Sequence, residues 1–323
     1  MITRNEKMLW LLLGAILVLL FLLSSTDLII KEEEKRIYPI SVIVEDDGDA
    51  NYVNFQKGMD QAAMERNADV SFITLYETGN AEQQQALALR EQEDGAAALV
   101  VVPAGEQGAS DILAARSLIP MVTVWADGTD AGAVAAVTTD FAGMGKNLAD
   151  KIGKDWAAGV PVYLFVQEQE KAAAREFGEA LAGRLAENGF YPRLIRKEGY
   201  GTFRNALEDL RESGIERAVL AGLDPDSLTE LSAILEGDEA LSACVGALYG
   251  RGSSLSLLNS LDRGIIRGLC VTDEFSAGYI SVWQAVEAAE GHVLGKRTVL
   301  ESYYIEKEDL RKSEYEKMLY PIE

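Results

Sequence analysis

The sequence has very few of the residues on which metal sites and acid–base catalysis most often depend. It contains one histidine, His292, and two cysteines among 323 residues. A single imidazole excludes any site that needs two of them, and it leaves a Ser-His-Asp arrangement only one candidate base. No metal-ligand cluster, nucleophile elbow or Walker loop is recognisable in the sequence. The sequence therefore predicts a protein that is not an enzyme and that uses no cofactor or metal.

The two cysteines leave the redox state open. Cys244 and Cys270 both lie in apolar, strand-like segments. A disulfide is compatible with an exported protein. Two buried free thiols are the simpler interpretation, and the sequence does not decide between them.

Positive charge is also scarce. The chain has 30 lysines and arginines against 52 acidic residues, a formal net charge of −22. Residues 1–36 hold five basic and five acidic residues, so the whole excess falls on the remainder. Such a negative field repels nucleic acid and anionic lipid headgroups, which excludes nucleic acid as a partner. The acidic surface supports solubility and identifies no ligand.

The first part of the chain is a long apolar run. Met8–Leu23 contains no charge, and Arg4 and Lys7 precede it. Its length is near the lower limit for a helix that spans about 30 Å of hydrocarbon. The flank Ser24–Asp27 has no small-x-small cleavage site and no lipoprotein cysteine, which favours an uncleaved anchor over a cleaved signal peptide. The basic residues before the run predict an extracellular remainder. The expected order is a cytoplasmic tail at 1–7, a transmembrane anchor at 8–25 in the cell membrane and a charged linker at 26–36.

The rest of the chain alternates between short apolar runs and amphipathic stretches. This alternation predicts parallel sheets that helices cover on both faces. Eleven strands are too many for one compact sheet of this length, and a break near Asp140 divides them into two doubly wound α/β lobes. Ligands bind at the carboxyl ends of such strands, so two facing lobes predict a clamp for a small molecule. The predicted strands are Ile40–Glu45, Val70–Tyr76, Ala97–Val102, Met121–Trp125, Ala133–Thr138, Val162–Val166, Pro192–Arg196, Ala218–Leu223, Val245–Tyr249, Ile265–Val271 and Val299–Ile305.

Several short motifs, in order, resemble one protein family. They are Ile40-Ser-Val-Ile-Val-Glu45 followed by Tyr52 to Gly58, Asp94-Gly95 with Pro103, Ile119-Pro120-Met-Val-Thr-Val, Val137-Thr-Thr-Asp140 with Gly145, Ala174-Arg175 with Gly178, and Asp273 to Gly278. Over Tyr38 to Leu310 the chain resembles the type I periplasmic sugar-binding proteins, the ribose-binding-protein group. Lac-repressor-type effector domains share that fold, but here a membrane segment stands where their DNA-binding domain would be.

The resemblance implies two parallel-sheet lobes joined by three hinge crossings. The crossings are expected near Asp140, Thr272–Asp273 and Tyr303–Ile305. Lobe one would then comprise 37–139 plus 274–302, and lobe two 140–273 plus 303–323.

The resemblance also implies a ligand site between the lobes, with contacts from the first lobe and the first crossing. The loop after the first strand contributes Asp49, Asn51 and Tyr52, although Asp46-Asp-Gly-Asp49 also reads as a solvated turn. Trp125 stands where the family often has an Asp-Arg pair, and it serves either as a stacking surface or as a core residue. The first crossing adds Asp140 and Phe141.

The second lobe is expected to contribute the remaining contacts. Arg175 matches a family residue that donates to the ligand, and its alternative is a surface pair with Glu179. Asp224 is either a ligand contact or the cap of the following helix. Leu223 and Gly250–Gly252 replace polar groups that the family usually places there. The other expected contacts are Tyr249, Arg251, Thr272 and Asp273.

Two functions are compatible with this architecture. The first is a solute-binding protein that carries a sugar-like ligand to an ABC permease. The second is a ligand-sensing ectodomain that partners a membrane sensor kinase, or one that binds a non-sugar signal molecule. The short N-terminal tail predicts that a separate membrane protein is the partner in either case.

Overall fold

The computed structural model describes residues 4–25, 36–46, 51–105, 117–168, 170–199, 201–215, 217–295 and 297–320. The chain forms two compact units, Met1–Ile37 and Tyr38–Glu323. The first contains α1 (Arg4–Ser25), which is long and apolar enough to cross a membrane by length and composition. None of its apolar stretch is buried within the protein, a property that an anchor and a signal sequence share.

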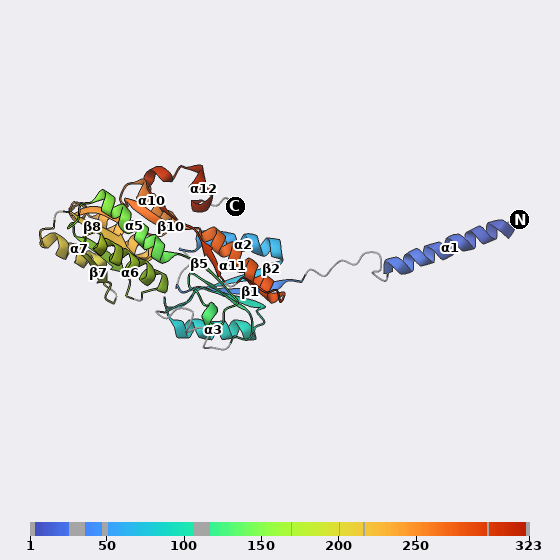
Figure 1. Ribbon diagram of the computed structural model, residues 1–323. Helices are drawn as coiled ribbons and strands as arrows, with labels where there is room; N and C mark the ends of the chain where they lie inside the picture. Colours follow the sequence, from blue (N-terminus) through green and yellow to red (C-terminus); the bar gives the residue numbers. More distant parts are fainter. Residues whose placement is uncertain are drawn as a thin grey trace. The chain divides into compact units, whose positions relative to one another are not determined.

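The second unit contains two six-stranded sheets. The first sheet is wholly parallel, with the strand order β11-β5-β4-β3-β1-β2. Helices α2 (Val53–Arg66) and α11 (Glu274–Ala289) cover one face, and α3 (Ala81–Glu93) covers the other (Figure 1). The strands are β1 (Tyr38–Ile43), β2 (Ala68–Ile73), β3 (Ala98–Val101), β4 (Met121–Val124), β5 (Ala135–Thr139) and β11 (Arg297–Leu300).

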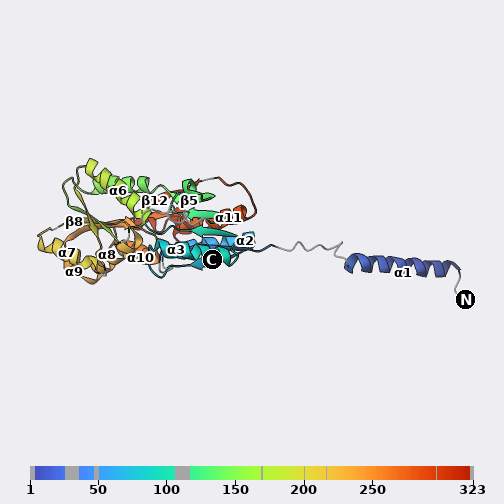
Figure 2. The ribbon, with the colours of Figure 1, turned by 90° about the horizontal axis from the view of Figure 1, so that it is seen from below.

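The second sheet has the order β12-β10-β9-β8-β6-β7, and only β12 runs antiparallel to its neighbour. Helices α5 (Phe141–Asp155) and α6 (Ala172–Glu187) cover one face (Figure 2). The other face is covered by α7 (Phe203–Glu212), α8 (Pro225–Gly237), α9 (Glu239–Ser242), α10 (Leu255–Asp262) and α12 (Ser313–Leu319). The strands are β6 (Val162–Val166), β7 (Pro192–Arg196), β8 (Ala218–Gly222), β9 (Val245–Arg251), β10 (Gly268–Thr272) and β12 (Ser302–Ile305). Short 3₁₀ helices lie at Thr129–Ala131 and Lys307–Asp309.

The chain passes between the sheets after β5, after β10 and between β11 and β12. The predicted fold class, two doubly wound lobes with three crossings, is confirmed. The single strand predicted over Val299–Ile305 is wrong, because the exposed Glu301 separates two strands that belong to different sheets. The third crossing therefore lies at Glu301, just before the predicted range Tyr303–Ile305.

A close pair of helices covers one face of each sheet. In the first lobe, a Cβ on Gly58 would lie 2.0 Å from the carbonyl oxygen of Phe275, and one on Gly278 would lie 2.0 Å from that of Phe55. Only glycine allows the backbones of α2 and α11 to approach so closely. Gly145 makes the same kind of approach from α5 to α6 in the second lobe. Both cysteines of the chain are free thiols.

Candidate functional site

Charged side chains from both lobes meet where the strands of the two sheets end. Glu45 and Asp46 follow β1 in the first lobe, and Lys171 directly precedes α6, which follows β6 in the second. The others lie at the end of β9 and in the first turns of α8 and α11. We call this group the interlobe cluster, and it consists of Glu45, Asp46, Lys171, Asp224, Asp226, Arg251 and Glu274.

Lys171 links the two lobes through carboxylates. Its Nζ donates a hydrogen bond to Oδ1 of Asp46. The same nitrogen lies 3.7 Å from Oε1 of Glu45 and 3.6 Å from Oδ2 of Asp226. Lys171, Glu45 and Asp46 are all buried, whereas the Asp226 side chain is 40% exposed. One ammonium group therefore serves three carboxylates, two of them from the opposite lobe.

A second polar contact joins the lobes beside Lys171. Nδ2 of Asn51, in the loop before α2, donates to Oδ1 of Asp226 at 2.8 Å. Tyr52 follows Asn51 but is buried, and its ring packs on Phe55 and Phe72 in the core of the first lobe. Burial, together with the negative charges of Asp46 and its neighbours, raises the pKa of Tyr52. Asn51 thus contacts the opposite lobe, and the buried ring of Tyr52 attaches the loop to the core of the first lobe.

The charged groups of the cluster shift one another's pKa. Burial raises the pKa of Glu45 to about 7, and Asp46 and Asp226 add to this shift while Lys171 and Arg251 oppose it. Burial alone disfavours the charged form of Lys171, but the surrounding carboxylates outweigh that cost and raise its pKa above its usual value. The ammonium is therefore held firmly charged, whereas the Glu45 carboxyl titrates close to neutral pH.

Arg251 holds the inner part of the cluster. Its Nε donates to the carbonyl oxygen of Leu223 at 3.3 Å, and its guanidinium lies 5.1 Å from the ring centroid of Phe141. Burial lowers its pKa, and the charges of Asp224, Glu45 and Glu274 oppose the shift. Phe141 itself is fully buried at the start of α5. The predicted residues Arg251 and Phe141 are therefore adjacent.

Asp224 caps a helix at the edge of the cluster. Its carboxylate accepts hydrogen bonds from the backbone nitrogen of Ser227 at 2.7 Å and from the Ser227 hydroxyl at 2.8 Å. The backbone nitrogen of Gln167 also donates to it at 3.4 Å. Burial raises the pKa of Asp224. Capping of α8, the alternative to a ligand contact, is realised in the structure, and it occupies both carboxylate oxygens.

Trp125 lies between the two lobes. Its backbone has φ = 61°, an unusual value for a bulky residue, and its nitrogen donates to the carbonyl oxygen of Val137 at 2.9 Å. The half-buried indole stands edge-on to Phe141, with the ring centroids 6.3 Å apart. Such strained backbone conformations concentrate at functional sites. The indole packs against the cores of both lobes.

The structure does not bring every predicted residue into the cluster. Tyr249 shares the α5-facing side of β9 with Arg251, but its hydroxyl donates to Asp155 at the C-terminal end of α5 at 2.9 Å and accepts from the Trp156 indole nitrogen at 3.2 Å. Asp140 and Asp273 cap α5 and α11 at two of the lobe crossings.

The remaining predicted residues have weaker links to the cluster. Thr272 is buried at the end of β10, next to the second crossing. Arg175 is half-buried in the first turn of α6, four residues beyond Lys171. Within the described residues it forms no ion pair with Glu179. Asp49 lies outside the described residues.

Several members of the cluster were not predicted as site residues. These are Glu45, Asp46, Lys171, Asp226 and Glu274, five of its seven residues. One signal was available for Glu45 and Asp46, because they directly follow the first strand, where ligands of parallel sheets bind. Lys171 stands beside the Ala174-Arg175 motif, but no local pattern indicates which lobe its side chain contacts.

A small cavity lies between the lobes. Its volume is about 10 Å³, and Glu45, Trp125, Ala172 and Ala173 are among the residues that line it. That volume holds about one water molecule. A sugar-sized molecule does not fit this cavity unless the lobes move apart.

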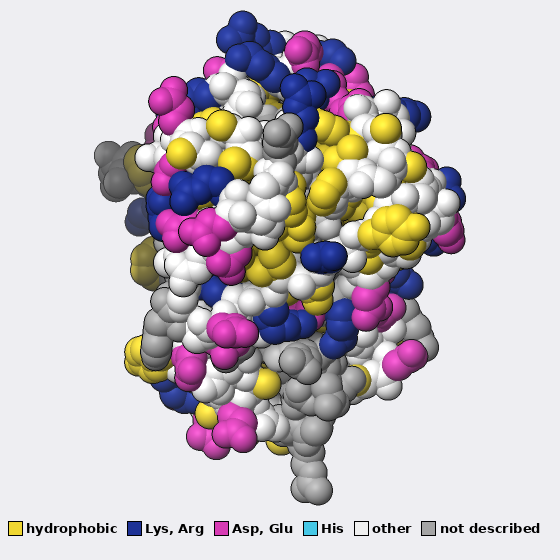
Figure 3. Space-filling model, turned by 90° about the vertical axis from the view of Figure 1, so that its left-hand side faces the viewer, with side chains coloured by type: hydrophobic (Ala, Val, Ile, Leu, Met, Phe, Trp, Pro, Cys, Tyr) yellow, Lys and Arg dark blue, Asp and Glu magenta, His cyan; other side chains and the backbone are white. Residues whose placement is uncertain are grey.

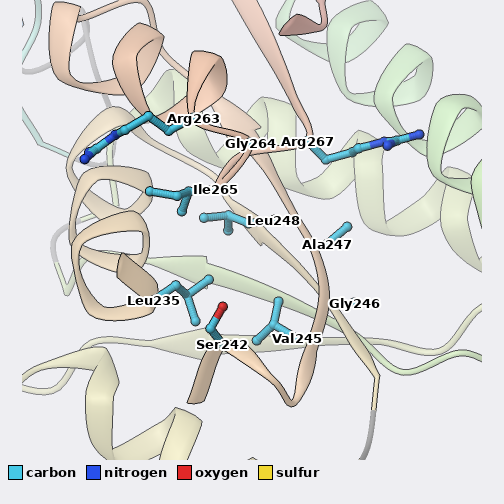
Figure 4. A pocket seen from close by; sticks show the side chains of 10 residues that line it. All are labelled: Leu235, Ser242, Val245, Gly246, Ala247, Leu248, Arg263, Gly264, Ile265 and Arg267. Carbon is cyan, nitrogen blue, oxygen red and sulfur yellow. The ribbon is translucent and has the colours of Figure 1, made fainter. Parts of the chain in front are cut away.

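A larger hollow of about 320 Å³ lies at the opposite, amino-terminal edge of the second sheet (Figure 4). Leu235, Leu248 and Ile265 line its centre, and Arg263 and Arg267 point away from it. Both arginines form ion pairs, with Glu236 and Asp155 respectively. Figure 3 shows the left-hand end of Figure 1, where apolar side chains form a band bordered by both signs of charge. The interlobe cluster remains the better candidate site, because charged and aromatic groups converge there.

Comparisons with known proteins agree with the two-lobed fold. Residues 40–292 match the family model described as "Periplasmic binding protein domain". None of the curated proteins matches the sequence.

Solved structures show the same fold at low sequence identity. A glucose-galactose binding protein from Geobacillus stearothermophilus is 17% identical, with a TM-score of 0.71, over 86% of this chain and 100% of that one. An ABC transporter solute-binding protein from Bacillus halodurans with bound myo-inositol is 18% identical, with a TM-score of 0.74, over 88% and 99%. One from Agrobacterium vitis with bound α-D-tagatopyranose is 16% identical, with a TM-score of 0.73, over 88% and 100%.

Proposed function

Because this chain belongs to the periplasmic binding protein domain family, we propose that it clamps a small, sugar-like ligand between its lobes and delivers it to an ABC-type importer. Family membership makes it a binding protein rather than an enzyme, as the sequence predicted. The observation that carries the proposal is the interlobe cluster, in which polar groups of both lobes meet beside an indole. Planar polar groups satisfy hydroxyls, and an aromatic ring covers the apolar face of a sugar.

Solved relatives support the class of ligand. The Bacillus halodurans protein holds myo-inositol, and the Agrobacterium vitis protein holds a ketohexose in its pyranose form. Both ligands are small rings that carry several hydroxyl groups. The proposed ligand of this chain is of the same kind, and its contacts are Asn51, Trp125, Arg175 and Arg251.

A ligand panel tests the proposal. The full-length chain in detergent is screened by thermal shift against pentoses, hexoses and inositols, and hits are measured by calorimetry. We expect at least one compound to stabilise the protein, and Trp125→Ala and Arg175→Ala to weaken its binding about tenfold or more. Tyr191→Ala, which removes an aromatic ring that is 80% exposed, is the matched control. A panel without any stabilising compound would contradict the proposal.

The delivery step predicts a membrane partner. We propose that α1 remains uncleaved and holds the lobes, taken as 37–139 plus 274–302 and 140–273 plus 303–323, on the extracellular side. Mass spectrometry of the membrane fraction should then find the chain with residues 1–25 present. Crosslinking in cells should capture an ABC permease in the presence of ligand. Capture of a sensor kinase instead would contradict the transport function and support a sensing function. A mature chain that begins after residue 25 would contradict the proposed membrane anchor.

A further inference from the structure

The three carboxylates around Lys171 do not share its ammonium equally. Only Asp46 lies within hydrogen-bond distance of Nζ, and Asp226 accepts a separate hydrogen bond from Asn51. Oε1 of Glu45 is 3.7 Å from Nζ, too far for a hydrogen bond. Among the described residues, the Glu45 side chain accepts no hydrogen bond. Among the described residues, Glu45 therefore has an ion pair with Lys171 but no hydrogen bond.

Glu45 is nevertheless withdrawn from water. The residue is 9% exposed, and it lines the interlobe cavity together with Ala172 and Ala173. A buried carboxylate without hydrogen bonds is unfavourable unless another group neutralises it. Arg251 is the other cation of the cluster; its charge opposes the rise in the pKa of Glu45, and its Nε donates to the Leu223 carbonyl oxygen rather than to Glu45. The carboxylate thus faces a cavity in which a ligand group can reach it.

The charge balance favours a cation in that position. The cluster holds five carboxyl groups, of Glu45, Asp46, Asp224, Asp226 and Glu274, against the two cations Lys171 and Arg251. A neutral sugar would leave this excess of three acidic groups in place as the lobes close. Burial, together with the charges of Asp46 and Asp226, raises the pKa of Glu45 to about 7, and Lys171 and Arg251 oppose that shift. A further cation beside Glu45 would favour its ionised form.

A second residue that lines the cavity also suits a cation. Trp125 lines the same cavity, and an indole face attracts ammonium groups through its quadrupole. A carboxylate and an indole together bind an ammonium by a charge-assisted hydrogen bond and a cation–π contact. Lys171 demonstrates that an ammonium group is stable a few ångströms away.

From this arrangement we infer that the ligand carries an ammonium group, as an amino sugar or amino polyol does, and that Glu45 binds this group beside Trp125. The inference rests on the proposed function, because it specifies the ligand of the same interlobe site. The ligand enters while the lobes are apart, and its amino end then occupies the position between Glu45 and the indole. Lys171 keeps its hydrogen bond to Asp46.

Matched pairs of ligands test the inference. Calorimetry on the full-length chain compares glucosamine with glucose, galactosamine with galactose and an aminodeoxyinositol with myo-inositol, at about pH 7. The uncharged N-acetyl derivatives and simple alkylammonium ions complete the set. We expect at least one amino compound to bind about tenfold or more tightly than its neutral counterpart and its N-acetyl derivative.

Variants locate the effect. Glu45→Gln removes the charge while it keeps the size of the side chain, and it should abolish the preference for the amino compound. Asp60→Asn also removes one negative charge, but at an exposed position of α2, and it should leave the preference intact. Between about pH 7 and about pH 5.5 the preference should weaken as Glu45 takes up a proton. Glu45 faces Lys171, Arg251, Asp46 and Asp226, and burial dominates its titration over all of them.

The outcomes separate the two claims. A neutral sugar that binds as tightly as its amino counterpart overturns the inference and leaves the proposed function standing. An alkylammonium ion that binds while no sugar or polyol does supports a cationic ligand and contradicts the sugar-like one. If Glu45→Gln still prefers the amino compound over its neutral counterpart, Glu45 is not the residue that binds the ammonium group. Absence of binding by every compound overturns both.

Discussion

Glu274 illustrates how one residue couples pH to stability. Its Oε1 accepts a 2.6 Å hydrogen bond from the Ser253 hydroxyl, which joins the loop after β9 to the first turn of α11. Burial raises its pKa to about 7, Asp273 adds to the shift, and Ser253 and Arg251 oppose it. The ordinary pKa of this group is 4.5, so between about 4.5 and about 7 the folded protein binds a proton that the unfolded chain has released. The contribution of Glu274 to stability is therefore full below about pH 4.5 and is lost as the pH rises through about 7.

Glu274→Gln removes this pH dependence at a single position. The neutral amide still accepts from Ser253, so the variant should be more stable than the original chain at about pH 8 by about 1–3 kcal/mol. The two should be nearly equal at about pH 4.5. Urea unfolding at both pH values measures the difference, with the exposed Glu176→Gln as the charge-matched control. Equal stability of variant and original chain at about pH 8 would contradict the raised pKa.

Pairs of helices, rather than single side chains, determine the packing of each lobe. The backbones of α2 and α11 meet at Gly58 and Gly278, although residues 67–273, which include the first two lobe crossings, separate the two helices in the sequence. Because α11 belongs to the first lobe but follows the second, this contact closes the first lobe only after the second has been traversed. The first lobe is therefore complete only when α11, which follows most of the second lobe in the sequence, packs against α2.

Alanine substitutions distinguish a required glycine from a dispensable one. Gly278→Ala places a Cβ against the carbonyl oxygen of Phe55 and should cost about 1–3 kcal/mol of stability through overpacking. Gly183→Ala, inside α6, meets no atom within 4 Å and should stabilise the protein by up to about 1 kcal/mol. Urea unfolding compares the two. An unchanged stability in Gly278→Ala would show that α2 and α11 are free to move apart.

Over the whole molecule, Lys171 connects the lobes without a ligand. Its ammonium bridges Asp46 of the first lobe and Asp226 of the second, and Asn51 reinforces the link. Nδ2 of Asn54 also donates to the carbonyl oxygen of Leu319 in α12 at 3.2 Å, which ties α2 to the C-terminal helix. A ligand that binds between the lobes must compete with this closed arrangement or enter during transient opening.

Lys171→Met should shift the lobes toward an open arrangement. Loss of one partner from a buried ion pair costs about 3–5 kcal/mol, because the carboxylates remain behind. Such a cost changes the ratio of closed to open molecules by a factor of about one hundred or more. Small-angle scattering should show a larger radius of gyration for the variant than for the original chain or for the exposed control Lys154→Met. A radius that stays the same would mean that other contacts hold the lobes together.

The sequence determined the local features of this protein. Strand and helix patterns follow from side-chain periodicity, so the α/β class, both lobes and most strand positions were predictable. Asp140, Asp224 and Asp273 precede helices for the same local reason, since a carboxylate there accepts the free backbone N–H groups. The apolar α1 was evident from composition alone.

Only the tertiary structure decided what surrounds the site. Glu45, Lys171 and Asp226 are far apart in the chain, and their proximity depends on how two lobes close over each other. The hydrogen bond from Tyr249 to Asp155 depends on where the C-terminal end of α5 lies. The split between β11 and β12 depends on which sheet offers each strand a partner. Contacts between lobes leave no periodic trace in the sequence, because each partner satisfies only its own local pattern. The two-lobed fold could therefore be predicted from sequence, whereas the charged contacts between the lobes could not.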